Sequence, residues 1–106
     1  MSEYLQITTT TGTRHDAEQI AAELVSRCLA GCVQVSGPIA STYRWQGKTE
    51  TSEEWVCTIK TGREQLEAIQ KVISEIHPYE VPELIATPIV GGSEKYLAWL
   101  KQQLGS

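Results

Sequence analysis

The chain has 106 residues, of which 41% are hydrophobic and 21% are charged, a composition that predicts one folded domain over residues 1–106 and excludes a disordered chain. Its net charge of −4 excludes a nucleic-acid partner, because phosphate binding relies on clustered Lys and Arg. No apolar run reaches the roughly 18 residues of a membrane span, and the first residues do not resemble a signal peptide, so we expect a complete, soluble, cytoplasmic protein with no membrane partner.

The first third of the chain predicts a strand and then a helix. Tyr4–Thr8 alternates apolar and polar residues, which is typical of a half-buried strand. Thr13, with Asp16 in the first turn, indicates a capped helix start, and Gly31 marks the helix end. The apolar residues that recur between them at helical spacing are Ala17, Ile20, Ala21, Leu24, Val25 and Cys28.

The middle of the chain predicts a long β-hairpin. A first strand runs from Cys32 and is interrupted at Gly37-Pro38, where we expect a bulge or a sheet edge because proline cannot donate a ladder hydrogen bond. A tight turn at Gln46-Gly47-Lys48 leads into the returning strand, which ends near Thr61. The alternation places Ile39, Ser41, Tyr43 and Trp45 on one face of the first strand, and Trp55, Cys57 and Ile59 on one face of the second.

The last third predicts a helix, a strand and a short helix. Thr61-Gly62-Arg63-Glu64 has the form of a capping box, Pro78 stops the helix that follows, Glu83–Ile89 forms the strand, and Ser93 caps the last helix. The inward residues are Leu66, Ile69, Val72, Ile73 and Ile76 in the first of these helices, and Tyr96, Leu97, Leu100 and Leu104 in the second. The order βαββαβ, with an extra C-terminal helix, predicts an α+β ferredoxin-like sandwich in which two helices cover one face of a four-stranded antiparallel sheet.

The length of the hairpin predicts self-assembly. Each strand is about twice the usual 5–6 residues, whereas helices of about 14–16 residues reach only about 20–25 Å, so the hairpin tip must project. Tyr43, Trp45 and Trp55 on such a ribbon would leave large apolar surfaces in water. We therefore expect a closed homo-oligomer with these three residues at its interface. A monomer whose last helix folds over the uncovered sheet face is the alternative.

Few side chains suggest a metal site or an active site. His77, at a helix end before Pro78, is expected to be exposed and is the candidate metal ligand, although it could simply favour the helix dipole. Cys28, Cys32 and Cys57 are expected to be reduced thiols, the first two acting as small core residues. His15 is expected at the surface. No nucleophile, base and orienting group stand out as a set, so we predict no catalytic residues and no enzyme.

A small-ligand cleft is expected at one end of the sheet. Lys60, at the end of its strand, could meet Tyr79, Glu80 and Glu83 of the following loop, which would combine a cation, a phenol and two carboxylates. An interface salt bridge between the same groups is the alternative. The nearby acidic cluster of Glu50, Glu53 and Glu54 is interpreted as a solvated, edge-protecting group.

Several segments in order resemble a known family. They are Ala30-Gly31-Cys32-Val33, Tyr43-Arg44-Trp45-Gln46-Gly47-Lys48, Ile59-Lys60-Thr61, His77-Pro78-Tyr79-Glu80-Val81-Pro82-Glu83 and Tyr96-Leu97-Ala98-Trp99-Leu100. Together they resemble the CutA divalent-cation tolerance proteins. The resemblance implies a ferredoxin-like homotrimer similar in build to the PII signalling proteins, with the hairpin packed against neighbouring subunits.

The resemblance also implies a non-enzymatic role in cellular tolerance of divalent metal ions, copper especially. Metal binding in the family is attributed to a cysteine and histidines; His77 matches one of these positions, while Thr9 and Ile76 occupy two others. No cofactor is therefore expected to be required. Copper or another divalent ion would bind weakly, because the soft ligands that select copper are absent at the positions of Thr9 and Ile76. A PII-like sensor that binds a small metabolite between subunits and signals to an unidentified protein partner is the open alternative.

Overall fold

The computed structural model describes residues 3–105; the expectations for residues 1–2, at the start of the chain, and for residue 106 lie outside this range. The elements are β1 (Tyr4–Thr11), α1 (Arg14–Ser26), β2 (Cys32–Trp45), β3 (Lys48–Gly62), a 3₁₀ turn η1 (Arg63–Gln65), α2 (Leu66–Ile76), β4 (Ile85–Ile89) and α3 (Glu94–Gln103). This order confirms the predicted βαββαβ arrangement with an added C-terminal helix. Within the described range, no helix is both long and apolar enough to cross a membrane.

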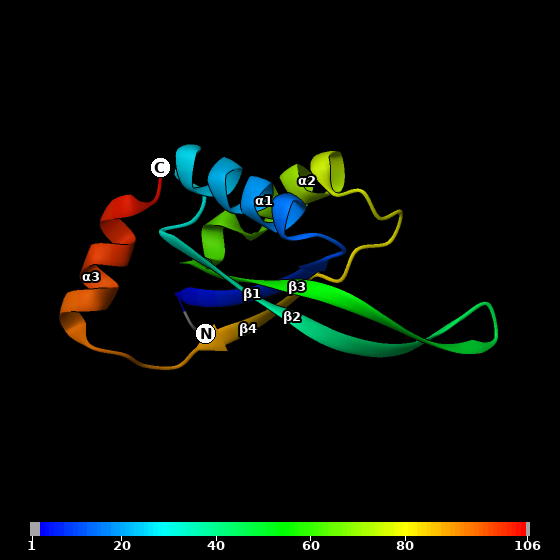
Figure 1. Cartoon of the computed structure of the whole chain (residues 1–106). Helices are drawn as coiled ribbons and strands as arrows, with labels where there is room; N and C mark the ends of the chain where they lie inside the picture. Colours follow the sequence, from blue (N-terminus) through cyan, green and yellow to red (C-terminus); the bar gives the residue numbers. More distant parts are fainter. Residues whose placement is uncertain (1–2, 106) are drawn as a thin grey trace.

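The four strands form one antiparallel sheet in the order β2-β3-β1-β4. Helices α1 and α2 lie side by side over one face of this sheet, as predicted, whereas α3 stands at the end opposite the hairpin tip (Figure 1). The other face, which we call the open face, carries no helix across its middle. Strand β1, at eight residues, is longer than the sequence suggested because it pairs with β3 along its whole length.

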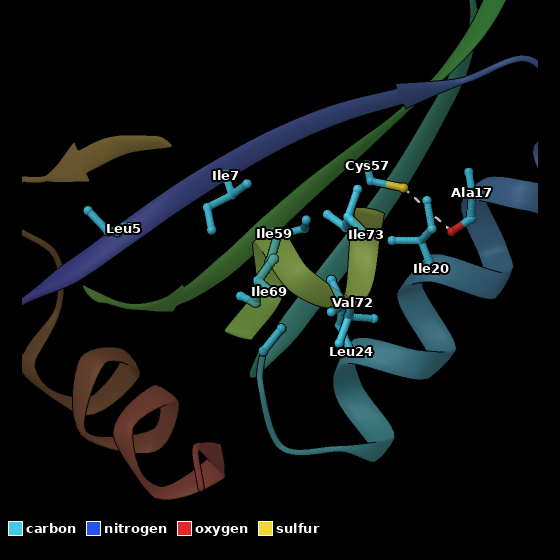
Figure 2. Close-up of a cluster of buried hydrophobic side chains, with 11 residues drawn as sticks. Leu5, Ile7, Ala17, Ile20, Leu24, Cys57, Ile59, Ile69, Val72 and Ile73 are labelled. Carbon is cyan, nitrogen blue, oxygen red and sulfur yellow. Dashed lines mark hydrogen bonds between the residues drawn. The ribbon is translucent and has the colours of Figure 1, made fainter. Parts of the chain in front are cut away.

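The core lies between the sheet and the two helices that cover it. Alternate residues of β1 and β3, such as Ile7 and Ile59, point to the helices and are fully buried (Figure 2). The helices contribute Ala17, Ile20, Leu24, Ile69, Val72 and Ile73. Three members of the stripes predicted for these two helices are instead exposed: Val25 to 45%, Ile76 to 37%, and Cys28, which lies past the end of α1.

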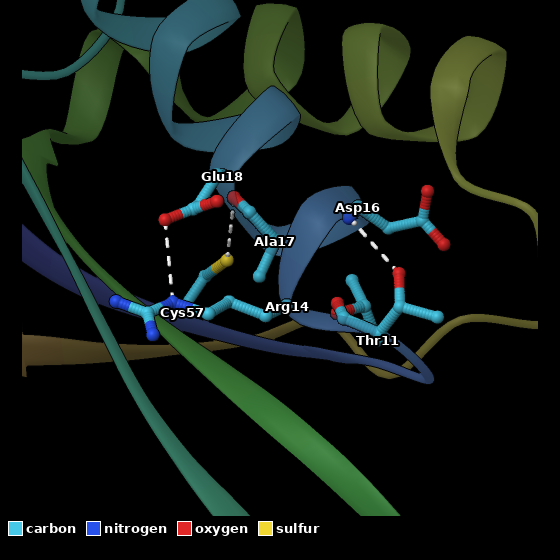
Figure 3. Close-up of polar contacts among 7 residues, drawn as sticks. Thr11, Arg14, Asp16, Ala17, Glu18 and Cys57 are labelled. Carbon is cyan, nitrogen blue, oxygen red and sulfur yellow. Dashed lines mark hydrogen bonds and ion pairs between the residues drawn. The ribbon is translucent and has the colours of Figure 1, made fainter.

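The start of α1 is as predicted, but its end is not. The Thr13 hydroxyl accepts a hydrogen bond from the Asp16 amide at 3.1 Å (Figure 3). The helix ends at Ser26 rather than near Gly31, because Cys28 adopts a positive φ of 58°. Gly31 serves another purpose: a Cβ built there would lie 2.4 Å from a Leu100 methyl group, so only glycine lets α3 pack this closely.

Two further expectations for the helices are wrong. The Thr61 hydroxyl does not cap α2 but donates to the Leu29 carbonyl at 2.6 Å, and the chain enters α2 through η1 with no side-chain cap. Ser93 does cap α3, by accepting from the Tyr96 amide. Tyr96 itself, expected to face inward, is 41% exposed and lies against Trp99 instead.

The hairpin projects as its length predicted. Strands β2 and β3 span 14 and 15 residues, and β1 pairs with β3 only from Trp55 onward, so the segment from Lys48 to Glu54 extends beyond the rest of the sheet (Figure 1). The molecule accordingly measures 45 × 25 × 22 Å. The register shifts between Ser36 and Ile39, which confirms the predicted irregularity at Gly37-Pro38.

We expect Thr9→Val to raise the free energy of unfolding by about 1 kcal/mol, because its hydroxyl costs desolvation and has no compensating hydrogen bond. Thr9 is fully buried, and its Oγ1 atom finds no partner among the described residues. Thr61→Val is the matched control, expected to lower stability by about 1–2 kcal/mol since it loses the bond to Leu29. Urea unfolding measures the free energy of unfolding of both variants. Equal changes in the two would contradict the assignment of Thr9 Oγ1 as a buried group without a hydrogen bond.

Candidate functional site

A cleft lies at the base of the hairpin, between the open face of β2 and β3 and the loop that joins α2 to β4. It has a volume of about 800 Å³, within the range usual for small-molecule sites. Its lining residues are Thr10, Ser41, Thr42, Tyr43, Trp45, Glu54, Tyr79, Glu80, Val81, Pro82 and Glu83. The cleft exists because β3 continues past the end of β1, which leaves room beside Glu54 for the loop to lie against the hairpin.

The buried charged group of the cleft is the carboxylate of Glu54. Its side chain accepts a hydrogen bond from the Tyr79 hydroxyl at 2.9 Å, and the residue is only 8% exposed. Burial, together with the hydrogen bond and negative charge of Glu54, raises the pKa of Tyr79 to about 12. The phenol therefore stays protonated and remains a hydrogen-bond donor at neutral pH.

His77 lies behind this pair and fixes the loop. Its Nε2 atom lies 2.7 Å from the Thr10 carbonyl, and its Nδ1 atom accepts a hydrogen bond from the Tyr79 amide at 3.0 Å. Since a carbonyl can only accept, Nε2 must donate, and the imidazole is the Nε2–H tautomer. The ring is 8% exposed and contacts the Tyr79 ring at 4.8 Å between centroids. The expectation that His77 is exposed is therefore wrong.

The structure brings together three of the four residues predicted for the ligand cleft. Tyr79, Glu80 and Glu83 line it, but Lys60 does not, because it lies opposite Gln6 in the sheet register and donates to the Gln34 side chain. The Lys60 side chain is six residues along β3 from Glu54, about 20 Å at the usual strand rise. The expected meeting of Lys60 with the loop is therefore wrong.

The three aromatic residues assigned to an interface lie on different faces. Tyr43 and Trp45 line the cleft and are 43% and 57% exposed. Trp55 points to the helix side of the sheet, packs against the core, and lies under the Arg14 guanidinium, which is 5.6 Å from its ring. In the sheet register, Glu54 pairs with Ile39 and therefore shares the face of Tyr43 and Trp45. Trp55 is the next residue after Glu54, and neighbouring residues of a strand face opposite ways, so Trp55 lies on the other face of the sheet.

Glu54 is the cleft residue that the sequence did not reveal. It was expected to be solvated with Glu50 and Glu53, and those two residues are indeed exposed. Glu54 is buried where it accepts the hydrogen bond from the Tyr79 hydroxyl. Gly12 leaves space for that hydroxyl, since a Cβ there would lie 3.2 Å from it. One sequence signal could have separated Glu54 from its acidic neighbours. Side chains alternate along a strand, so Glu54 lies on the face of Ile39 and not on the face of Trp55.

The cysteines are free thiols, as predicted, but only one lies in the core. Cys28 is exposed and Cys32 is half-buried, so their assignment as core residues is wrong. Cys28 lies just past the end of α1, where its φ is positive. Cys57 is fully buried, and its Sγ atom donates to the Ala17 carbonyl at 3.4 Å (Figure 3).

We expect Cys57 to make the protein less stable as the pH rises above 9. Burial raises the pKa of its thiol from 9.0 to about 11, so between these values the unfolded chain has lost a proton that the folded chain keeps. Stability then falls by up to about 1.4 kcal/mol per pH unit. Urea unfolding over this range should show a steeper decline for the wild type than for Cys57→Ala; parallel declines would contradict the prediction.

The described residues do not provide a ready metal site within one chain. No group of three or more His, Cys, Asp and Glu side chains in residues 3–105 is placed to hold an ion. Both ring nitrogens of His77 already have hydrogen-bond partners, so an ion could bind there only by displacing one of them. The residues present therefore do not fit a resident copper centre, and His77 as a metal ligand stays a prediction.

The fold and the cleft define a class: an α+β protein whose ferredoxin-like sheet extends into a long hairpin with a cleft at its base. Comparison with known proteins places the chain more narrowly. The family of the CutA1 divalent ion tolerance protein matches residues 5–103, and the chain belongs to this family. The predicted resemblance is thereby confirmed.

Individual relatives agree with this assignment. The chain is 42% identical over 88 residues to the protein CutA, chloroplastic, of Arabidopsis thaliana, covering 83% of this chain but only 48% of the relative. It is 37% identical to the divalent-cation tolerance protein CutA of Thermus thermophilus, covering 84% of this chain and 86% of that protein. The crystal structure of CutA1 from Shewanella sp. SIB1 superposes with a TM-score of 0.96 at 41% identity, covering 99% and 98% of the two chains.

Proposed function

We propose that this chain acts as a non-enzymatic homotrimer in the cellular tolerance of divalent metal ions, copper among them, and that it does so in the cytoplasm. The observation that carries the proposal is the family match over nearly the whole chain. The relatives are named for ion tolerance and not for a reaction. The chain spans only about half the length of the plant relative, so the tolerance role rests on the shared domain.

The proposed trimer is supported by what the chain leaves uncovered. The hairpin beyond β1 carries Tyr43 and Trp45, and β4 at the sheet edge presents Ile85, which is 55% exposed. Exposed apolar side chains of this kind are typical of an interface, and β4, as an edge strand of the sheet, can accept another strand. A closed ring of three chains, similar in build to PII proteins, would cover both.

The proposed ion binding is weak and takes place between chains. Glu80 and Glu83 of the cleft loop are exposed, and carboxylates from two subunits can together supply the oxygen ligands that one chain lacks. Copper would bind without the selectivity of a thiolate or imidazole site. Tolerance would then arise from weak buffering of the ions rather than from tight capture.

Growth of a host strain that lacks its own CutA homologue tests the role. Expression of this chain should raise the Cu(II) and Zn(II) concentrations that halve growth, and an unchanged tolerance would overturn the proposal. Isothermal titration of the purified protein with both ions should give weak heats that are equal in the wild type and in His77→Gln. Binding heats that are present in the wild type and absent in His77→Gln would show instead that His77 is a metal ligand.

A further inference from the structure

The charged side chains that line the cleft at the base of the hairpin are all negative. Three of its side chains are carboxylates, those of Glu54, Glu80 and Glu83, and none of its lining residues is Lys, Arg or His. Three others are aromatic rings, those of Tyr43, Trp45 and Tyr79. Acidic groups alone would indicate only a solvated surface, but here one of the carboxylates is buried and the others lie beside aromatic rings.

Glu54 is the observation that points to a ligand. At 8% exposure it is more than nine-tenths buried, yet the hydrogen bond that it accepts comes from the neutral phenol of Tyr79. It forms no ion pair with the described residues, whose salt bridges join Arg14–Glu18, Arg27–Glu23 and Lys101–Glu3. A buried carboxylate without a counter-charge is costly. A cation bound in the cleft would supply that charge.

The aromatic rings indicate which kind of cation fits. Faces of Trp and Tyr attract ammonium groups and pack well against methylene chains, whereas a metal ion prefers several oxygen ligands converging at about 2–2.6 Å. Among the described residues, no group of three or more His, Cys, Asp and Glu side chains is placed to hold a metal ion. Within one chain, a cleft lined by both carboxylates and aromatic rings therefore suits an extended organic cation better than a metal ion.

We infer that the cleft binds an aliphatic diamine or polyamine cation. One ammonium group neutralises Glu54, the methylene chain lies along Tyr43 and Trp45, and a second ammonium group faces Glu80 and Glu83. The Tyr79 hydroxyl holds the Glu54 carboxylate in place for this contact. The inference goes beyond ion tolerance and does not depend on it; in the proposed trimer a neighbouring chain would add the outer wall of the cleft.

Titration calorimetry at low and constant ionic strength tests the inference, with 1,5-diaminopentane and spermidine as probes and neutral 1,5-pentanediol as the control ligand. We expect saturable binding of both amines and none of the diol. Glu54→Gln should weaken binding by about tenfold or more, because a charge-assisted contact is lost. Glu53→Gln, an exposed neighbour on the opposite face, makes the same charge change and should leave the affinity unchanged.

A second variant separates loss of the ligand site from loss of the fold. The double change Glu80→Gln and Glu83→Gln alters only exposed loop residues, and it should weaken diaminopentane while leaving pentylamine, which has one charge, unaffected. Light scattering should give the same mass for every variant. Absence of saturable binding to the wild type, or equal affinities of Glu54→Gln and Glu53→Gln, would overturn the inference, and neither result bears on ion tolerance.

Discussion

Ile59→Ala is expected to lower the free energy of unfolding by about 3–5 kcal/mol, because it removes buried methyl groups and leaves a cavity that the packed core cannot close. Ile59 is fully buried on the helix-facing side of β3. Strand β3 lies between β2 and β1, so neither the sheet nor the helices can move inward without disturbing a neighbour.

A graded series makes this expectation measurable. Ile59→Val, which removes one methylene group, should cost about 1 kcal/mol, and Val90→Ala, at a residue 96% exposed, should change stability by less than about 0.5 kcal/mol. Urea unfolding at one fixed protein concentration is the appropriate measurement, since any self-assembly makes the midpoint depend on concentration. A loss below about 1 kcal/mol for Ile59→Ala would contradict the described core.

Gly37→Ala is expected to cost about 3 kcal/mol, through a strained backbone and an overpacked neighbour together. Gly37 has a φ of +147°, a conformation that residues with a Cβ rarely adopt. A Cβ there would also lie 2.9 Å from the Trp55 ring and 3.1 Å from the Glu54 carbonyl. The ring is held against the core and the carbonyl belongs to β3, so neither can yield easily.

Substitutions at two other glycines separate the cost of backbone strain from the cost of overpacking. Gly47 has a φ of +79°, but a Cβ added there would meet nothing within 4 Å, so Gly47→Ala should cost only the backbone term of about 1 kcal/mol. Gly91 has open space as well and no positive φ, so Gly91→Ala should be nearly neutral. Unfolding midpoints that rank Gly37→Ala no worse than Gly47→Ala would contradict the geometry at the bulge.

The elements of the fold were predictable because local chemistry specifies them. Alternating residues, the Gly37-Pro38 interruption and the turn at Gln46-Gly47 predict a long hairpin from signals that lie within the segment itself. The Thr13 and Ser93 caps were found for the same reason, since each acts on an amide three residues away. The end of α1 was missed because Cys28, not a glycine, takes the left-handed conformation.

The candidate site was only partly predictable, because it depends on contacts between distant segments. Glu54 and Tyr79 are 25 residues apart, and His77 reaches Thr10 across 67. A glutamate in an acidic cluster and a histidine before proline both suggest exposure, and only the folded chain shows that each is covered. Lys60 was misplaced for a similar reason, since its strand position depends on the register with β1.

The proposed trimer rests on one physical claim, that the projecting hairpin and the open face are surfaces that only sister chains can bury. Light scattering coupled to size exclusion, at micromolar concentration in neutral buffer, tests it most directly. We predict a particle of three times 11.7 kDa, about 35 kDa, that does not shrink on dilution. A particle of 11.7 kDa would contradict the claim.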